Sequence, residues 1–298
     1  MAGDDPGRTL GPKHVRWRSR PGSTGVIMLV AFEGWSDAGD AASTAVRHLA
    51  DQWDAEPFAS IDPEIFYDFS STRPRMQFDA DLQREIVWPD NTFSLATPPD
   101  SEVDVVTLTG VEPGLRWRTF TEQVIGVAHE LGAEFVLTFG ALLAEVPHSR
   151  PSSVFATSYD DEVIRSFGLL PSRYEGPTGI TGVLHTACGD AGLQSASLWT
   201  AVPSYVPAAS SPKAALALVR RAVDLLDLTV STTELEIAAA SYERQVDDVV
   251  SEDDETRDYV ARLVERFDLG TADPFADGEE SLVDEVERFL RDQPGQPE

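Results

Sequence analysis

The chain has 298 residues, 42% of them hydrophobic and 25% charged, and its 51 acidic and 23 basic residues give a formal net charge of −28. A field of this sign repels phosphate backbones and anionic headgroups, which argues against nucleic-acid and membrane-surface partners. The single cysteine, Cys188, excludes an intrachain disulfide, and the longest apolar run, Val26–Phe32, is too short to span a bilayer. We therefore expect a cytoplasmic protein of one large domain or two small ones.

Apolar runs alternate with segments of helical periodicity along the first 230 residues. Val26–Phe32 is typical of a strand buried on both faces, and an Ala-rich helix is predicted over Ala41–Gln52. Further strands are predicted at Phe58–Ile61, Glu64–Phe69, Glu85–Trp88, Val103–Val111, Glu134–Phe139 and Leu193–Ala201. Further helices are predicted at Trp117–Leu131, Asp160–Phe167, Thr181–Cys188 and from Ser211 to about Leu228. This alternation predicts a three-layer α/β/α fold around a mostly parallel, mixed sheet.

The last quarter of the chain has a different character. Thr233-Glu-Leu-Glu236 fits a capping box, and the apolar spacing that follows predicts two amphipathic helices between residues 232 and 269. Residues 231–298 contain 21 acidic and 6 basic residues, a net charge of −15. The acidity is typical either of a solvated helix face with an acidic tail or of a docking surface for a basic partner.

We divide the chain into four parts on these grounds. They are a flexible arm at 1–24, a core domain at 25–230, a helical extension at 231–269, and an acidic tail at 270–298 with a short helix at Leu282–Arg291.

The sequence contains no phosphate loop, dinucleotide fingerprint or metal-binding motif, so we expect no cofactor and no metal. Gly34-Trp-Ser-Asp-Ala38 lies between a predicted strand and a predicted helix, as a nucleophile elbow does, but it lacks the second glycine. Ser36 or Asp37 is expected instead to cap the next helix. Only two lysines, Lys13 and Lys213, are available to hold nucleotide phosphates, which disfavours ATP-dependent ligation. No residue is assigned a catalytic role.

Charged side chains gather after three of the predicted buried strands. Because the carboxyl ends of parallel strands converge, we expect these side chains to share one rim of the sheet. The Glu175–Gly179 loop is a further candidate, which either exposes N–H groups to an anion or forms a tight turn before the next helix. The candidate ligand-binding residues are Glu33, Asp37, Glu112, Arg116, Arg118, Glu145, His148, Arg150 and Glu175.

Two interpretations of the rim stay open. The arginines could grip an anion with both guanidinium nitrogens, or they could pair with Glu33, Glu112 and Glu145 to hold the loops. His148 is suited either to acid–base chemistry or to a structural contact.

Four segments in this order resemble the proteasome assembly chaperone 2 family in its actinobacterial form, over roughly residues 25–270. They are Phe32-Glu-Gly-Trp-Ser-Asp-Ala-Gly-Asp40, Gly110-Val-Glu-Pro-Gly-Leu-Arg-Trp-Arg-Thr-Phe120, Gly140-Ala-Leu-Leu-Ala-Glu-Val-Pro-His-Ser-Arg-Pro151 and Tyr174-Glu-Gly-Pro-Thr-Gly-Ile180. Ser36 departs from the asparagine expected in many members.

The resemblance implies an α/β/α fold similar to the nucleoside phosphorylase class, self-association, and a chaperone-like or scaffold role without an established reaction. We accordingly expect a homo-oligomer, most simply a trimer, with a protein partner. The alternative is a small-molecule-binding enzyme or sensor that uses the Arg/Glu/His rim.

Overall fold

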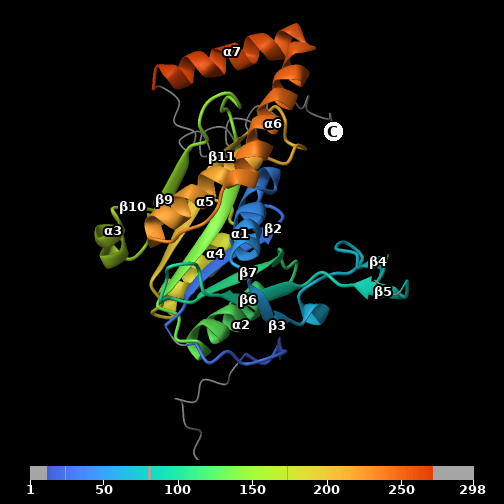
Figure 1. Ribbon diagram of the computed structural model, residues 1–298, viewed down its shortest axis with the longest axis vertical. Coiled ribbons are helices and arrows are strands. Elements are labelled where there is room, and N and C mark those ends of the chain that lie inside the picture. The colour runs from blue at the N-terminus through green and yellow to red at the C-terminus, as the bar shows by residue number, and fades with distance from the viewer. Residues whose placement is uncertain (1–11, 24, 80–81, 173, 271–298) are drawn as a thin grey trace, which may run out of the picture.

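A mixed nine-stranded sheet organises the computed structural model, which describes residues 12–23, 25–79, 82–172 and 174–270 (Figure 1). The strand order is β1-β3-β6-β7-β2-β8-β11-β9-β10, and the central strands β7, β2, β8 and β11 are mutually parallel. The flanking pairs β1–β3, β3–β6, β6–β7 and β9–β11 are antiparallel. The strands are β1 Val15–Trp17, β2 Ile27–Glu33, β3 Glu56–Ile61, β6 Asn91–Ala96, β7 Val105–Val111, β8 Phe135–Ala144, β9 Val154–Ser158, β10 Leu170–Pro171 and β11 Ser195–Pro203. The predicted mixed sheet with a parallel centre is confirmed.

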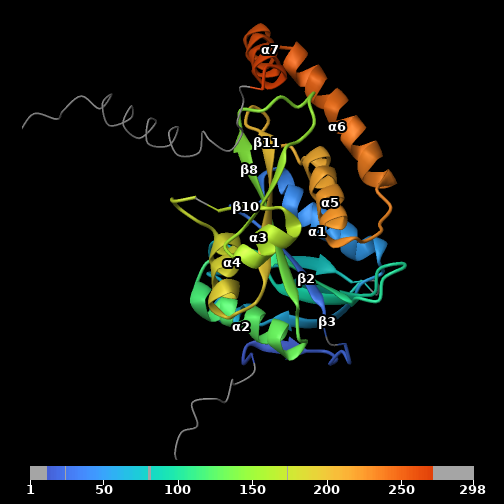
Figure 2. The same cartoon turned by 90° about the vertical axis from the view of Figure 1, so that its left-hand side faces the viewer.

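Helices cover both faces of the sheet (Figure 2). On one face, α1 (Ala41–Gln52) and α5 (Pro212–Leu226) pack on a core that contains Leu29. On the other, α2 (Trp117–Glu130) and α4 (Ile180–Asp190) pack on a core that contains Met28. Neighbouring residues of β2 enter different cores because successive side chains of a strand point to opposite faces. The predicted three-layer arrangement is therefore confirmed. The short helix α3 spans Asp161–Phe167.

Two predicted features near the first antiparallel strands are wrong, and one predicted strand is confirmed. Glu64–Phe69 is not a strand, because Asp62 accepts the Glu64 N–H at 3.2 Å and Pro63 opens a 3-10 helix, Pro63–Ile65. Residues 15–17, placed in a flexible arm, instead form β1 and pair with β3. The predicted strand Glu85–Trp88 exists as β5 (Arg84–Val87), but it pairs with β4 (Arg75–Phe78) in a separate two-stranded hairpin.

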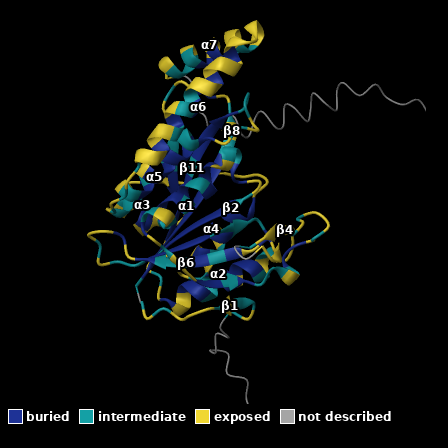
Figure 3. Cartoon of the chain, turned by 45° about the vertical axis from the view of Figure 1, so that its right-hand side comes forward, coloured by how far each residue is buried: buried dark blue, intermediate teal, exposed yellow. Residues whose placement is uncertain are grey.

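The C-terminal extension consists of the two expected helices, α6 (Thr233–Ser251) and α7 (Asp254–Asp268), whose outer faces are exposed (Figure 3). The predicted capping box is wrong. Thr232 is the N-cap residue, and its hydroxyl donates to the Glu236 carboxylate at 2.8 Å instead of accepting a backbone N–H. The predicted helix Leu282–Arg291 lies outside the described residues. No helix in the described part of the chain is long and apolar enough to cross a membrane.

His185 is a buried titratable group inside α4. Its ring lies 4.8 Å from the Tyr159 ring between centroids, and its Nε2 has no hydrogen-bond partner among the described residues. Burial lowers the pKa of His185 from 6.5 to about 4, against the smaller effect of a backbone hydrogen bond with Ser195. The folded protein therefore holds this imidazole neutral at pH values where the unfolded chain protonates it.

This difference predicts acid sensitivity. Because the folded pKa lies below the unfolded one, the stability contribution is complete above pH 6.5 and is lost as the pH falls toward 4. Between pH 7 and pH 5 the loss from this group is about 2 kcal/mol. Urea unfolding across this range should show a smaller pH slope for His185→Leu than for the wild type. Equal slopes in the two proteins would contradict the assignment.

Candidate functional site

The carboxyl ends of β2 and β7 form a switch point in the sheet. These adjacent parallel strands lead into helices on opposite faces, β2 into α1 and β7 into α2. Their outgoing loops therefore separate, and open α/β sheets bind ligands in the crevice at such a position. The first group of predicted site residues lies here.

Glu112 ties three segments together at the switch point. Its Oε1 accepts the Ile180 N–H at 2.8 Å, and its Oε2 accepts the Trp35 N–H at 3.2 Å. A carboxylate at the N-terminus of α4 is favoured by the helix dipole. A Cβ added to Gly179 would lie 2.6 Å from Ser36 Oγ and 2.9 Å from Glu112 Oε1, so this approach requires glycine. The loop that begins at Glu175 therefore leads into a helix N-terminus where the Ile180 N–H already binds the protein's own carboxylate.

Asp37 caps α1, as one of the two expected capping residues. Its Oδ1 accepts the N–H groups of Ala42 and Ser43 at 2.7 and 3.1 Å. Burial raises the pKa of the Asp37 carboxyl, opposed by the hydrogen bonds from Ser43 and Ala42. The Ser36 hydroxyl is buried and has no hydrogen-bond partner in the described part of the chain. A nucleophile needs a base within hydrogen-bond reach, so this arrangement favours the capping interpretation of the segment.

The remaining predicted residues of this region face solvent. Glu33 forms an ion pair with Arg47 of α1. Arg116 has a left-handed backbone, φ 55°, at the N-cap of α2, and its side chain is exposed, as are those of Arg118 and Glu175. Trp35, which follows β2 directly, is 62% exposed.

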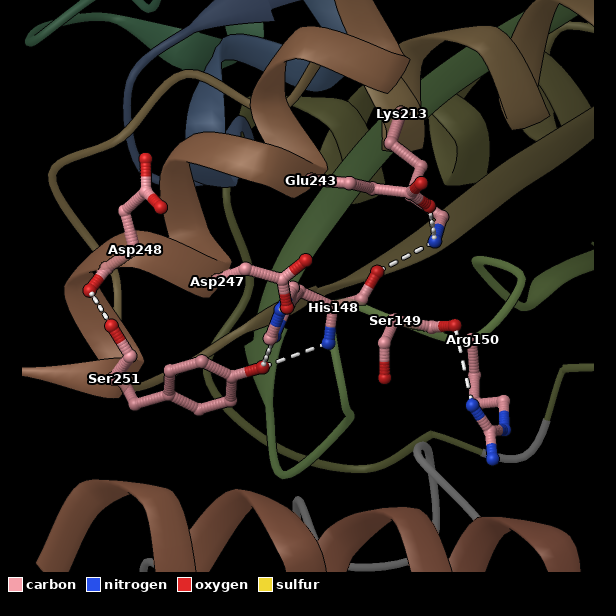
Figure 4. Close-up of polar contacts among 9 residues, drawn as sticks. His148, Ser149, Arg150, Lys213, Glu243, Asp247, Asp248 and Ser251 are labelled. Carbon is pink, nitrogen blue, oxygen red and sulfur yellow. Dashed lines mark hydrogen bonds and ion pairs between the residues drawn. The ribbon is translucent and has the colours of Figure 1, made fainter. Parts of the chain in front are cut away.

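His148 is the centre of a second group, shown in Figure 4. Its backbone N–H donates to the Tyr205 hydroxyl at 2.7 Å, and its Nδ1 lies 2.7 Å from the same oxygen. Its Nε2 lies 2.9 Å from Asp247 Oδ1 of α6, and because a carboxylate oxygen can only accept, Nε2 donates this hydrogen bond. Only 2% of the His148 side chain is exposed. The imidazole thus fastens α6 to the loop that follows β8.

Lys213 reinforces the same junction. Its Nζ donates to the His148 carbonyl at 2.6 Å and forms an ion pair with Glu243 of α6, and 14% of its side chain is exposed. The cavity beside His148 and Lys213 has a volume of about 10 Å³. This space suits about one water molecule and excludes a metabolite.

Two further predicted residues bind α7. Arg150 donates from Nε and Nη2 to the two oxygens of Asp268, both at 2.7 Å, and holds the pKa of that carboxyl below its usual value. Glu145 accepts from Arg266 at 2.9 Å and from the Tyr259 hydroxyl at 3.1 Å. The loop after β8 therefore forms the polar contacts that hold the helical extension against the core domain.

The interpretation in which rim arginines pair with rim glutamates does not hold for three of the candidate residues. Glu33, Glu145 and Arg150 pair with Arg47, Arg266 and Asp268, which lie on α1 and α7. The structure brings Glu112 and Asp37 to one junction, and His148 to another with Glu145 and Arg150 on the same loop. The residues that sequence reasoning missed are Arg47, Tyr205, Lys213, Asp247, Asp268 and Arg266. The sequence does contain a signal for Lys213. It is one of only two lysines in the chain, and it lies in the first turn of α5, beside a run of alanine and leucine.

No group of three or more His, Cys, Asp or Glu side chains in the described ranges is placed to hold a metal ion. The sheet and its covering helices, with α6 and α7 seated on the loop after β8, define an α/β/α protein with a helical extension. The PAC2 family model matches residues 31–250. The chain belongs to the PAC2 family.

Solved structures support this assignment. A PAC2 family protein from Streptomyces avermitilis is 43% identical, with a TM-score of 0.74, over 78% of this chain and 99% of that one. A proteasome-assembly chaperone homologue from Mycobacterium tuberculosis is 44% identical, with a TM-score of 0.72, over 79% and 100%. A Mycobacterium tuberculosis protein of unknown function is 27% identical, with a TM-score of 0.77, over 95% of both chains. No protein with a curated functional description matched the chain.

Proposed function

We propose that this protein is a self-associating, non-catalytic assembly scaffold that binds a protein partner. The observation that carries the proposal is the state of His148, the one acid–base candidate of the predicted rim. It is buried, held between Tyr205 and Asp247, and adjoins a cavity of about 10 Å³. A substrate has no room beside it, and its hydrogen bonds hold a helix in place. This argument disfavours the enzyme or sensor alternative, because that alternative depends on His148 as its acid–base group.

An exposed surface at the switch point is suited to a protein partner. We give the name Trp35 face to the exposed side chains of the three segments that Glu112 joins: Trp35 after β2, Leu115 and Arg116 after β7, and Tyr174 and Glu175 before α4. Trp35, Leu115 and Tyr174 are 62%, 46% and 55% exposed. Aromatic and arginine side chains dominate the binding energy of protein interfaces. The Glu112 contacts with Trp35 and Ile180 hold two of the contributing loops in place, which lowers the entropy cost of binding.

Family membership narrows the class of partner. One relative is described as a proteasome-assembly chaperone homologue. We therefore propose that the Trp35 face binds a proteasome subunit or an assembly intermediate built from such subunits.

Native mass spectrometry of the protein from its own cells tests the proposal. We expect masses at multiples of the 32.5 kDa chain and a complex that also contains proteasome subunits. Trp35→Ala should remove the partner and leave the homo-oligomer intact, because the indole is exposed. Leu269→Ala, at another exposed apolar side chain, serves as the control. A 32.5 kDa monomer at all micromolar concentrations, or a retained stoichiometric metabolite without a protein partner, would sink the proposal.

A further inference from the structure

The β4–β5 hairpin projects from the body of the molecule and has two unlike faces (Figure 1). Its register pairs Met76 with Ile86 and Phe78 with Arg84, which puts these four side chains on one face. Met76, Phe78 and Ile86 are 64%, 63% and 52% exposed. We call this surface the hairpin face. Three large apolar side chains therefore stand in water on one side of a two-stranded sheet.

The opposite face of the hairpin is mainly polar. Gln77 and Glu85 are paired there, and Gln77 Nε2 donates to Glu85 Oε1 at 2.5 Å. Alternation of apolar and polar side chains along a strand is the pattern of a sheet with one buried face. The strands have the sequence of a half-buried sheet, and the described part of the chain leaves their apolar side uncovered.

The hairpin is held in a fixed position at its base. Phe69, which packs against the core, contacts the Trp88 ring at 4.8 Å between centroids with an interplanar angle of 63°. Beyond this anchor, the strands have only each other as sheet neighbours. An isolated two-stranded hairpin is marginally stable in water and gains stability when its apolar face is covered. The anchor presents the face to a partner, and the exposed side chains supply the driving force.

Charge identifies the partner as a second copy of this chain. Residues 73–88 contain three arginines and three carboxylates, a net charge of zero, whereas the whole chain has −28. The hairpin therefore adds no net charge to the repulsion between two acidic copies, so a second copy can approach it at little electrostatic cost. Arg84 lies over the Phe78 ring at 5.9 Å, so its charge rests on the apolar surface it would help to cover. A contact between identical patches is isologous and closes as a twofold pair, so the inference replaces the expected trimer with a dimer or an assembly of such pairs.

We propose that the hairpin face packs against the same face in a neighbouring copy and forms the core of the self-association interface. The inference rests on the self-association in the proposed function and assigns it to Met76, Phe78 and Ile86. It is separate from the Trp35 face, which is left free for the other partner.

A pair of substitutions on neighbouring positions of β4 tests the inference. Phe78→Glu places a carboxylate on the hairpin face opposite Arg84, and Gln77→Lys places an ammonium on the other face opposite Glu85. Each new charge has an attractive cross-strand partner, so each hairpin should still fold. By light scattering, Phe78→Glu should shift self-association to concentrations at least ~30-fold higher, as expected for the loss of an apolar anchor. Gln77→Lys should match the wild type.

Cross-linking gives an independent measurement. The native Cys188 is fully buried, and burial raises the pKa of its thiol to about 12, so an introduced cysteine is the reactive one. Met76→Cys should give covalent dimers with a short bis-maleimide, and Gln77→Cys should give few.

The outcomes separate this inference from the proposed function. A monomeric wild type would remove the self-association and the hairpin contact together. An oligomeric wild type whose Phe78→Glu variant stays oligomeric, with equal cross-linking at positions 76 and 77, would overturn the hairpin contact alone. A Phe78→Glu variant that keeps its oligomer but loses a different protein would also overturn it, because the face would then belong to that protein.

Discussion

Replacement of Gly110 by alanine should lower the free energy of unfolding by about 3 kcal/mol, because the new methyl group would overlap backbone atoms of the neighbouring chain segment. A Cβ on Gly110 would lie 2.1 Å from the Asp90 carbonyl oxygen and 2.7 Å from the Asn91 Cα. Asn91 is fully buried, and its side chain donates to Tyr67 at 2.5 Å and to the Val111 carbonyl at 3.2 Å. The alanine would therefore force β6 and β7 apart where the Asn91 side chain is fixed.

Gly114 provides the matched control in the same Gly110-Val-Glu-Pro-Gly114 segment. A Cβ there has nothing within 4 Å, and Gly114 does not have a positive φ. Gly114→Ala should stay within about 0.5 kcal/mol of the wild type in urea unfolding. If both variants unfold at the wild-type midpoint, the close approach of β6 to Gly110 is not as described.

Replacement of His148 by alanine should cost about 4 kcal/mol and loosen the helical extension. The change deletes a ring whose side chain is 2% exposed, and it removes the contacts of Nδ1 with Tyr205 and of Nε2 with Asp247. The loss of stability has two causes: the cavity left by the ring, and the loss of a hydrogen-bond partner by Tyr205 and Asp247. In hydrogen exchange, protection in α6 and α7 should be lower in the variant than in the wild type, whereas protection of the central strands should be unchanged.

Ser149→Ala is the control for this second prediction. Ser149 is the exposed neighbour of His148, and its change should leave both stability and exchange near wild type. A His148→Ala protein with unchanged protection in α6 would mean that the apolar contacts of Tyr242, Val246 and Val250 hold the helix without the imidazole.

The fold was largely predictable because its central elements have strong periodic signals. Val26–Phe32 and Glu134–Phe139 are apolar runs that only a doubly covered strand accommodates, and both became central strands. β6 and β9 were missed because their sequences, Asn-Thr-Phe-Ser-Leu-Ala and Val-Phe-Ala-Thr-Ser, mix small polar residues into short strands. Glu64–Phe69 was misassigned because its apolar residues anchor a turn in the core, where Phe66 and Tyr67 are buried.

The site was less predictable, since ion pairs depend on contacts between distant segments. Topology predicted that Glu33, Glu112 and Glu145 follow parallel strands; Glu112 and Glu145 do, and Glu33 is the last residue of β2. Nothing in the local sequence indicated that Arg150 pairs with Asp268, 118 positions later, or that His148 meets Asp247 after 99. Those partners belong to α6 and α7, whose docking position the alternation of strands and helices does not specify.

The burial of Lys213 has a consequence for the chemistry of the surface. One of the two lysines, Lys213, is engaged by the His148 carbonyl and Glu243, while the other, Lys13, is exposed just before β1. Acylating reagents must reach the amine, and the Lys213 Nζ is engaged by two acceptors on a side chain that is only 14% exposed. Among the lysine side chains, acylation and enzymatic conjugation are therefore directed to Lys13. The protein has in effect a single addressable lysine, placed just before the edge strand of its sheet.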